Sequence, residues 1–449
     1  MKTYFIAFLS LLVMFANVQL FSCTIFYVSL DNKTFAGNNE DWKDPYSKMW
    51  FYPPELNKHG WIKFGWGSGF PQGGMNDQGL FWDASSGAHL AMPLSEANKE
   101  EYPGVLMQKV IEECSNINEA LAVFSEYYCQ DQYKAQYLIG DSIGNSIIVE
   151  GDNYIPIAST FQILTNFYHS HPDLGGYPCW RYETAFEMLS NNYNLTPYFI
   201  GSILEATHQD GQYPTQYSNI YDLNNCHIFL FYYHNYDEFI KIDLKKELSK
   251  GYKSYNIPKL FSRVKLKAPS NGNNIASTTV TIRWEGKPGN SYTVIYSTDP
   301  DFNKSTSKSS IYAFDYSNKN SSFFYYLPLL LLTPLIRKKN TLSLSIIILF
   351  IVIFSSQCKK SEPLTPEVQV IEMTEILSDL LPNTTYYWKI EAHGVNQNHL
   401  HSETITRHFY TGGTSNFKIL KHAVLSVKST LFETTIFDYF KYNSWFHWE

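Results

Sequence analysis

A cysteine lies where an apolar N-terminal segment gives way to a strand-like segment. Residues 4–16, YFIAFLSLLVMFA, form the apolar stretch of a leader that carries Lys2 near its start, and the small residue Ser22 directly precedes Cys23. Cleavage after Ser22 would give Cys23 a free α-amine. The ordinary pKa values of a thiol, about 8.5, and of an α-amine, about 7.7–8.0, are close enough for the amine to accept the thiol proton. These residues predict an exported protein with an N-terminal cysteine nucleophile.

The same cysteine allows two other interpretations. The segment LFSC is similar to a lipobox, in which the cysteine is linked to diacylglycerol and then N-acylated, so that thiol and amine are both consumed. Phe21 disfavours this alternative, as does the strand-like segment TIFYVSL, which begins directly after Cys23 instead of a polar tether. The second alternative is a catalytically inactive fold that serves as a surface binding module.

Five further motifs follow Cys23 in order. They are FAGNNEDW (35–42), GGMNDQGLFWDASS (73–86), DSIGNSIIVEGD (141–152), LTNF (164–167) and CWRYETA (179–185). Together with the opening CTIF, they resemble the N-terminal-nucleophile linear amide hydrolases. This group contains choloylglycine hydrolases, penicillin V acylases and the acyltransferases of penicillin biosynthesis. The resemblance covers about residues 23–255.

The resemblance implies four catalytic residues. Cys23 would be the nucleophile, and Asp41 would orient its amine. Asn166 would stabilise the oxyanion of the tetrahedral intermediate, and Arg181 matches the second arginine of the family's active site. The family's first arginine is replaced by Asn38, which departs from the family pattern for activating the thiol.

The resemblance also implies a substrate class and the residues that contact it. The residues expected around the substrate are Asn38, Asn39, Asn76, Trp82 and Ser86. The implied reaction is cleavage of a linear C–N amide in a small molecule through an acyl-thioester, without a cofactor or metal. Conjugated bile acids, phenoxyacetyl penicillins, N-acyl amino acids and acyl-homoserine lactones all fit, as do hydrolysis and acyl transfer.

Composition gives no support for several other classes. The net charge of −7 includes no basic block, so no nucleic-acid partner is expected. The six cysteines are scattered and form no CxxC pair, which gives no indication of a metal site. His169 and His171 lie close together in YHSHPD, but no third ligand accompanies them, so we expect a loop there.

The pattern of apolar residues predicts a mixed α+β protein. A hairpin is expected from CTIFYVSL and KTFAGNN, with a turn at Asp31 and Asn32. Helices are expected in two segments of 102–128, the second opening with a capping box of Asn116 and Glu119. Because strands and helices occur in blocks, a layered arrangement is favoured. The family resemblance implies a four-layer αββα sandwich.

The chain divides into six predicted segments. They are a signal peptide (1–22), the αββα domain (23–261), the first part of a fibronectin type III-like β-module (262–321), an apolar insert (322–360), the second part of the β-module (361–413) and a tail of unassigned role (414–449). The smaller domain is thus expected to be an all-β sandwich that the insert interrupts.

The insert contains two apolar runs, 323–336 and 341–357, which the basic residues 337–339 separate. If the two β-parts pair, the insert crosses a membrane twice or not at all. A membrane hairpin with its basic turn in the cytoplasm, a buried insert and a junction of two gene products all fit. The expected location is the periplasm, the cell surface or the extracellular space, with membrane association through 323–357 in the first of these cases.

Overall fold

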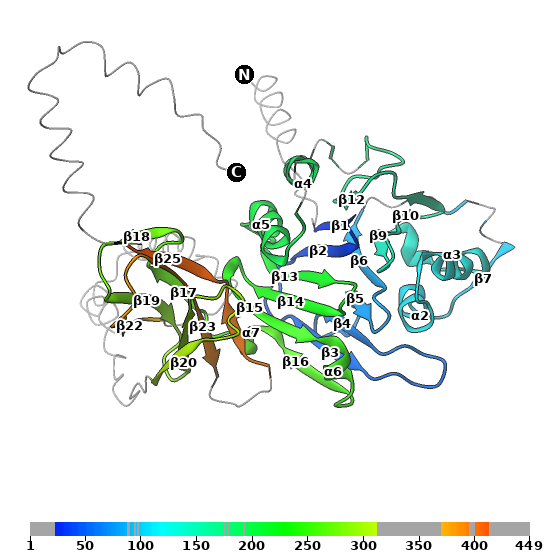
Figure 1. Cartoon of the computed structure of the whole chain (residues 1–449). Helices are drawn as coiled ribbons and strands as arrows, with labels where there is room; N and C mark the ends of the chain where they lie inside the picture. Colours follow the sequence, from blue (N-terminus) through cyan, green and yellow to red (C-terminus); the bar gives the residue numbers. More distant parts are fainter. Residues whose placement is uncertain are drawn as a thin grey trace, which may run out of the picture.

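Two β-sheets face each other, and helices cover the outer face of each (Figure 1). The computed structural model describes residues 23–87, 90–93, 96, 98–174, 176–177, 179–191, 194–311, 370–394 and 400–412. The order of the layers is helix, sheet, sheet, helix, as the sequence predicted for the first domain.

The first sheet begins with the strand that follows Cys23. Its first six strands in spatial order are β12 (Phe161–Leu164), β1 (Thr24–Leu30), β2 (Lys33–Asp41), β13 (Thr215–Asp222), β14 (His227–Tyr232) and β15 (Asn235–Asp243). The predicted β1–β2 hairpin turns at Asp31 and Asn32, whose φ angles of 51° and 60° are those of a tight hairpin turn. Thr24 pairs with Asn39, so Cys23 lies beside the end of β2.

The second sheet packs against the first through apolar side chains. Its strands in spatial order are β11 (Asn153–Pro156), β10 (Ser146–Glu150), β9 (Ala135–Gly140), β6 (Phe81–Ser86), β5 (Pro71–Asn76), β4 (Trp61–Gly65), β3 (Lys48–Tyr52) and β16 (Lys253–Asn256). One core contains Ile25 of the first sheet together with Ile62 and Leu138 of the second, and these three residues have no exposed surface. Alternate residues of each strand therefore face the opposite sheet or a helix layer.

Four helices form the outer layers (Figure 1). Helices α4 (Trp180–Ser190) and α5 (Pro197–Thr207) cover the first sheet, and α2 (Leu106–Glu113) and α3 (Ile117–Glu126) cover the second. The predicted cap is present, because the Asn116 side chain accepts a hydrogen bond from the backbone N–H of Glu119 at 3.1 Å. The short elements are β7 (Glu100–Glu101), β8 (Tyr127–Tyr128), the 3-10 helix η2 (Gln130–Tyr133), α6 (Leu244–Leu248) and α7 (Ile257–Leu260).

A β-sandwich continues the first sheet beyond β15 (Figure 1). One of its layers contains β24 (Ser402–Thr404), β23 (Thr384–His393), β20 (Ser291–Ser297), β21 (Thr306–Ile311), β25 (Arg407–Thr411) and β18 (Asn273–Ile275); the other contains β17 (Lys265–Ala268), β19 (Val280–Gly286) and β22 (Ile371–Leu377). Strand β19 pairs with β22, and β20 pairs with β23. Strands before the predicted insert therefore pair with strands after it, around the buried side chains of Trp284 and Trp388.

A buried carboxylate joins the sandwich to the layered part. Glu238 on β15 accepts hydrogen bonds from the backbone N–H of Ser262 at 2.8 Å and of Val264 at 2.9 Å, and from the hydroxyl of Ser402. Nearby, Arg407 donates to Asp237 at 3.1 Å. These contacts satisfy the buried charge and fix the sandwich at the edge of the first sheet.

Several predicted segments lie outside the described residues: the signal peptide 1–22, the insert 322–360 with its apolar runs, and the tail 414–449. Among the helices that the structure describes, none is both long and apolar enough to span a membrane.

Candidate functional site

A cavity of about 240 Å³ opens beside the first described residue, Cys23. Its wall is drawn from both sheets and includes Cys23, Glu40, Trp42, Phe70, Ser85 and Tyr137. The Cys23 side chain is only 7% exposed. A sulfur atom therefore lies in the wall of a small cavity that has aromatic and polar sides.

The guanidinium of Arg181 holds the predicted catalytic residues together. From the start of α4 its Nη1 donates to the carbonyl oxygen of Cys23 at 2.9 Å and to the hydroxyl of Thr24 at 3.0 Å. Its Nη2 donates to Oδ1 of Asn166 at 3.0 Å, and Nη1 lies 3.6 Å from Oδ2 of Asp41. The buried guanidinium is therefore committed to the protein's own oxygens and not to a substrate carboxylate.

Asn166 lies between Arg181 and the cavity wall. Its Nδ2 donates to the Ser85 hydroxyl at 3.0 Å and to the carbonyl oxygen of Ser86 at 2.9 Å. With Arg181 fixing its oxygen, the amide has a single orientation. The Ser85 hydroxyl accepts from Asn166, so its own proton is available for another acceptor, and Ser85 lines the cavity.

Three buried carboxyl groups surround the thiol. The Cys23 thiol donates a long hydrogen bond to Oε1 of Glu40 at 3.7 Å. Burial raises the pKa of Glu40 to about 7, although a hydrogen bond from Asn38 at 3.1 Å favours the ionised form. Burial also raises the pKa of Asp83 on the facing sheet well above its ordinary value, and the charge of Glu40 adds to this effect.

Asp41 is buried on the other side of the same strand. Burial raises its pKa well above the ordinary value, and the Arg181 charge opposes this shift. Its Oδ1 accepts from the Thr215 hydroxyl at 2.5 Å. Its Oδ2 has an ion-pair contact with Arg181 but, among the described residues, no hydrogen bond. One carboxylate oxygen beside the start of β1 therefore has capacity for another donor.

The same surroundings suppress ionisation of the thiol. Burial raises the pKa of Cys23 well above its ordinary value, and the charges of Glu40, Asp41 and Asp83 raise it further. A hydrogen bond from the backbone of Asp41 acts in the opposite direction. While residues 1–22 precede it, Cys23 is therefore protonated at neutral pH and is a poor nucleophile.

Three of the residues predicted to bind substrate have side chains outside the wall of this cavity. Asn39 donates to the Leu204 carbonyl on α5 at 2.9 Å. Asn76 donates to the Ile111 carbonyl at the end of α2 at 2.9 Å, and the indole of Trp82 packs in the core below α2 and α3. In each case strand alternation turns the side chain toward a helix or a structural hydrogen bond.

The other two residues predicted to bind substrate lie nearer the thiol. Ser86 lines the cavity. Asn38 lies on the same face of β2 as Glu40, and it contacts that carboxylate instead of the cavity itself. Asn38, at the position where the resemblance implies an arginine, thus places a neutral side chain beside Glu40, whose pKa is raised.

Three residues of the site, Glu40, Asp83 and Ser85, were not predicted from the sequence. The alternation of residues along a strand was a usable signal for Glu40, since Asn38 and Glu40 are two apart and share one face. No local signal was available for Asp83 and Ser85, because they reach the thiol only through packing of the second sheet on the first. The rings of the two loop histidines contact oxygens of the protein: the His169 ring contacts the Ile163 carbonyl at 2.9 Å, and the His171 ring contacts the Ser170 hydroxyl at 3.0 Å.

No model of a protein family matches this chain, and no curated protein matches it. Solved structures do align with it. A variant of the conjugated bile acid hydrolase from Clostridium perfringens aligns with a TM-score of 0.42 and 15% identity, covering 52% of this chain and 97% of that one. A second mutant of that enzyme gives a TM-score of 0.42 and 16% identity, with 52% and 96% covered.

The penicillin V acylase from Agrobacterium tumefaciens gives a TM-score of 0.41 and 16% identity, covering 52% of this chain and 91% of that one. The region of similarity is therefore about half of the chain. Identity and TM-scores this low do not determine the activity of this protein.

Proposed function

We propose that this chain is an exported hydrolase of linear C–N amides, in which removal of residues 1–22 turns Cys23 into an N-terminal nucleophile. One observation carries the proposal: three buried carboxyl groups, Glu40, Asp41 and Asp83, lie around the Cys23 thiol, whereas among the described residues Arg181 is the buried cation in contact with this site. Buried charges of one sign are unfavourable without a partner.

Cleavage would supply the second cation. The α-ammonium of Cys23 would form at the start of β1, next to the end of β2 where Glu40 and Asp41 lie. Oδ2 of Asp41 has acceptor capacity there, so it is the natural partner of the new ammonium group. The positive charge would also lower the pKa of the adjacent thiol, reversing the suppression that the carboxyl groups cause. The acidic surroundings thus suit the cleaved chain better than the uncleaved one.

The reaction steps use groups of this chain. In the reactive form the neutral α-amine of Cys23 has taken the thiol proton, which gives an ammonium–thiolate pair; the sulfur then forms a bond to the amide carbon while the carbonyl electrons move onto oxygen. Collapse of this oxyanion breaks the C–N bond, and the leaving amine takes the proton from the α-ammonium. Water then attacks the thioester, with the same amine as base, and releases the acid and the thiol.

Ser85 is the neutral donor proposed for the oxyanion; the predicted donor Asn166 joins it only by turning one N–H away from the Ser85 hydroxyl or the Ser86 carbonyl, because both of its N–H groups are donated there. Nδ2 of Asn166 and the Ser85 hydroxyl are 3.0 Å apart, and Ser85 lies in the same cavity wall as Cys23. A pre-oriented donor of this kind is worth roughly 3–4 kcal/mol in the transition state. Arg181 acts as a positioning residue, because it fixes Asn166 and the backbone of Cys23.

The cavity wall suggests the kind of amide. Trp42, Phe70 and Tyr137 offer apolar surface for the acyl group. Glu40 and Asp131 line the same cavity, and both disfavour an anionic leaving group close to the thiol. We therefore propose an aromatic or aliphatic acyl group joined to a neutral or cationic amine. Lys134 lines the same cavity 3.3 Å from Asp131 and partly offsets its charge.

The buried position of the sulfur argues against the lipid-anchor alternative. A lipid-modified Cys23 would have to carry a diacylglycerol group out of a site where the side chain is 7% exposed and contacts Glu40. Strand β1 begins at the next residue, so no tether separates the anchor from the fold.

A panel of N-acyl amides tests the proposal on three forms of the protein: the cleaved chain, the cleaved chain with Cys23→Ala, and a chain that retains residues 1–22. We expect amine release from the first form alone. Equal turnover by the Cys23→Ala form would refute the nucleophile, and equal turnover by the uncleaved form would refute the role of the α-amine.

A further inference from the structure

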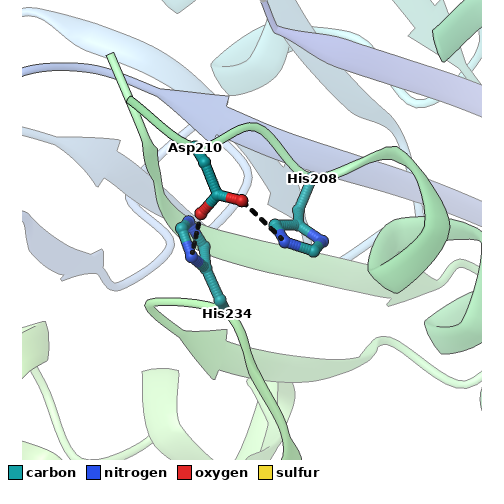
Figure 2. Close-up of side chains that lie close together, drawn as sticks. All are labelled: His208, Asp210 and His234. Atoms are coloured by element: carbon teal, nitrogen blue, oxygen red, sulfur yellow. Dashed lines mark ion pairs between the residues drawn. The ribbon is translucent and has the colours of Figure 1, made fainter. Parts of the chain in front are cut away.

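Two histidines and an aspartate lie close together at the end of the first sheet where β2 ends with Asp41 (Figure 2). His208 follows the last residue of α5, and Asp210 lies two residues later in the loop to β13. His234 lies in the turn between β14 and β15, where its φ of 58° lets the chain reverse tightly. Within the described part of the chain this is the one group of three or more such side chains that could hold a metal.

The donor atoms have separations that suit a small divalent ion. Nδ1 of His234 lies 3.1 Å from Oδ1 of Asp210, and Nε2 of His208 lies 3.9 Å from Oδ2 of Asp210. All three donor atoms lie within 4.8 Å of one another. In a tetrahedral Zn²⁺ site with bonds of about 2.0–2.2 Å, donor atoms are about 3.4 Å apart. Small side-chain rotations bring these three atoms to that spacing.

The histidines already have the surroundings of metal ligands. Nδ1 of His208 contacts the Glu205 carbonyl at 2.5 Å, which leaves Nε2 with its lone pair directed to Asp210. The His234 side chain is only 18% exposed, and its Nδ1 faces Asp210. The Asp210 side chain is 79% exposed, which leaves an entry path for the ion.

We propose that His208, Asp210 and His234 bind a divalent transition metal of the Zn²⁺ class, with solvent in the fourth position. Imidazole and carboxylate donors in this ratio are typical of Zn²⁺ sites with three protein ligands. The spacing of 26 residues between the histidines hides the site from a sequence motif search, since only the fold brings α5 and the β14–β15 turn together.

The ion would fix the loop that supports Asp41. Backbone N–H of Gln209 donates to the Thr215 hydroxyl at 2.8 Å, and backbone N–H of Thr215 donates to the Gln209 carbonyl at 2.8 Å. The same Thr215 hydroxyl donates to Asp41. A metal that joins residues 208 and 210 to His234 would therefore restrain the loop next to the acidic site. This inference does not depend on the proposed amide hydrolysis.

Zn²⁺ binding to the full chain, purified without a histidine tag, tests the inference by titration calorimetry and by hydrogen exchange of the 208–215 segment. We expect a single Zn²⁺ per chain, and slower exchange in this segment when Zn²⁺ is bound. Asp210→Asn keeps the shape of an exposed side chain and should weaken binding by roughly 100-fold, as should His208→Gln. The matched control is His393→Gln, which removes one ring of another close histidine pair among the described residues, with His401 at a centroid distance of 5.0 Å.

The three variants distinguish a metal site at His208, Asp210 and His234 from binding elsewhere. Stoichiometric binding that is lost in Asp210→Asn and His208→Gln and kept in His393→Gln supports the site. Absence of Zn²⁺ binding to the wild-type chain, or binding that neither Asp210→Asn nor His208→Gln weakens, overturns it.

Discussion

Glu40→Gln is the substitution whose effect follows most directly from the acidic surroundings of Cys23. Glu40 is buried beside the thiol, and its pKa is raised to about 7. Glutamine has nearly the same shape, keeps an oxygen that can accept the hydrogen bond from Asn38, and carries no charge. The substitution therefore removes the titration of Glu40 and changes the packing very little.

The sign and size of the effect can be worked out. A carboxyl group whose pKa is higher in the folded than in the unfolded protein binds its proton more tightly when folded, so stability falls as pH rises. The fall begins near the ordinary pKa of 4.5 and ends near the folded value of about 7. One pKa unit corresponds to about 1.4 kcal/mol, so this difference costs about 3 kcal/mol of unfolding free energy above pH 7. Glu40→Gln removes that cost.

Urea unfolding at a series of pH values from 4 to 8 measures this effect in the chain that retains residues 1–22. The stability difference between Glu40→Gln and wild type should increase with pH by about 3 kcal/mol and level off above pH 7. In the cleaved chain the α-ammonium should make the increase smaller. The control is Glu150→Gln: Glu150 is also buried, but it accepts from the backbone N–H of His169 at 2.6 Å, so its loss should cost about 1–3 kcal/mol. If the stability difference between Glu40→Gln and wild type does not change with pH, Glu40 does not titrate with a raised pKa in the folded protein.

Three further substitutions test other parts of the structure. Arg181→Met should lower the unfolding free energy in urea by about 3–5 kcal/mol, because it leaves Asp41 buried without its cation; a loss below 1 kcal/mol would contradict the role of that ion pair. Ser85→Ala should reduce kcat on a cleaved amide roughly 10²-fold with little change in KM, if its hydroxyl donates to the oxyanion; an unchanged kcat would remove Ser85 from the site. Trp388→Ala should cost about 3–5 kcal/mol, because its side chain is fully buried in the sandwich core; thermal unfolding that remains unaltered would contradict that packing.

Local pairing explains why part of the site could be predicted from sequence. Cys23 and Asp41 belong to one hairpin, so a turn at Asp31 and Asn32 is enough to bring the two strand ends together. Gly37 in the same hairpin also has a local explanation, because a Cβ atom there would lie 2.4 Å from the ring of Phe26 on the neighbouring strand. The helices were predictable from apolar spacing and caps.

Contacts between distant segments explain what could not be predicted. Glu40 influences Asp83 only because two sheets pack face to face, and no sequence pattern specifies which polar residue of one sheet meets which of the other. The positions of Asn76 and Trp82 away from the cavity have the same explanation: alternation shows that a residue has a face, but only the packing shows which face borders the cavity. His208 and His234 come together through the end of a helix and a hairpin turn.

Peptide mass spectrometry of the mature N-terminus shows whether Cys23 is the first residue. We expect a peptide that begins at Cys23 with an unmodified amine and thiol, because only that form supplies both the nucleophile and the cation beside Asp41. A peptide in which Ser22 still precedes Cys23, or a diacylglyceryl or N-acyl mass on Cys23, would contradict this expectation.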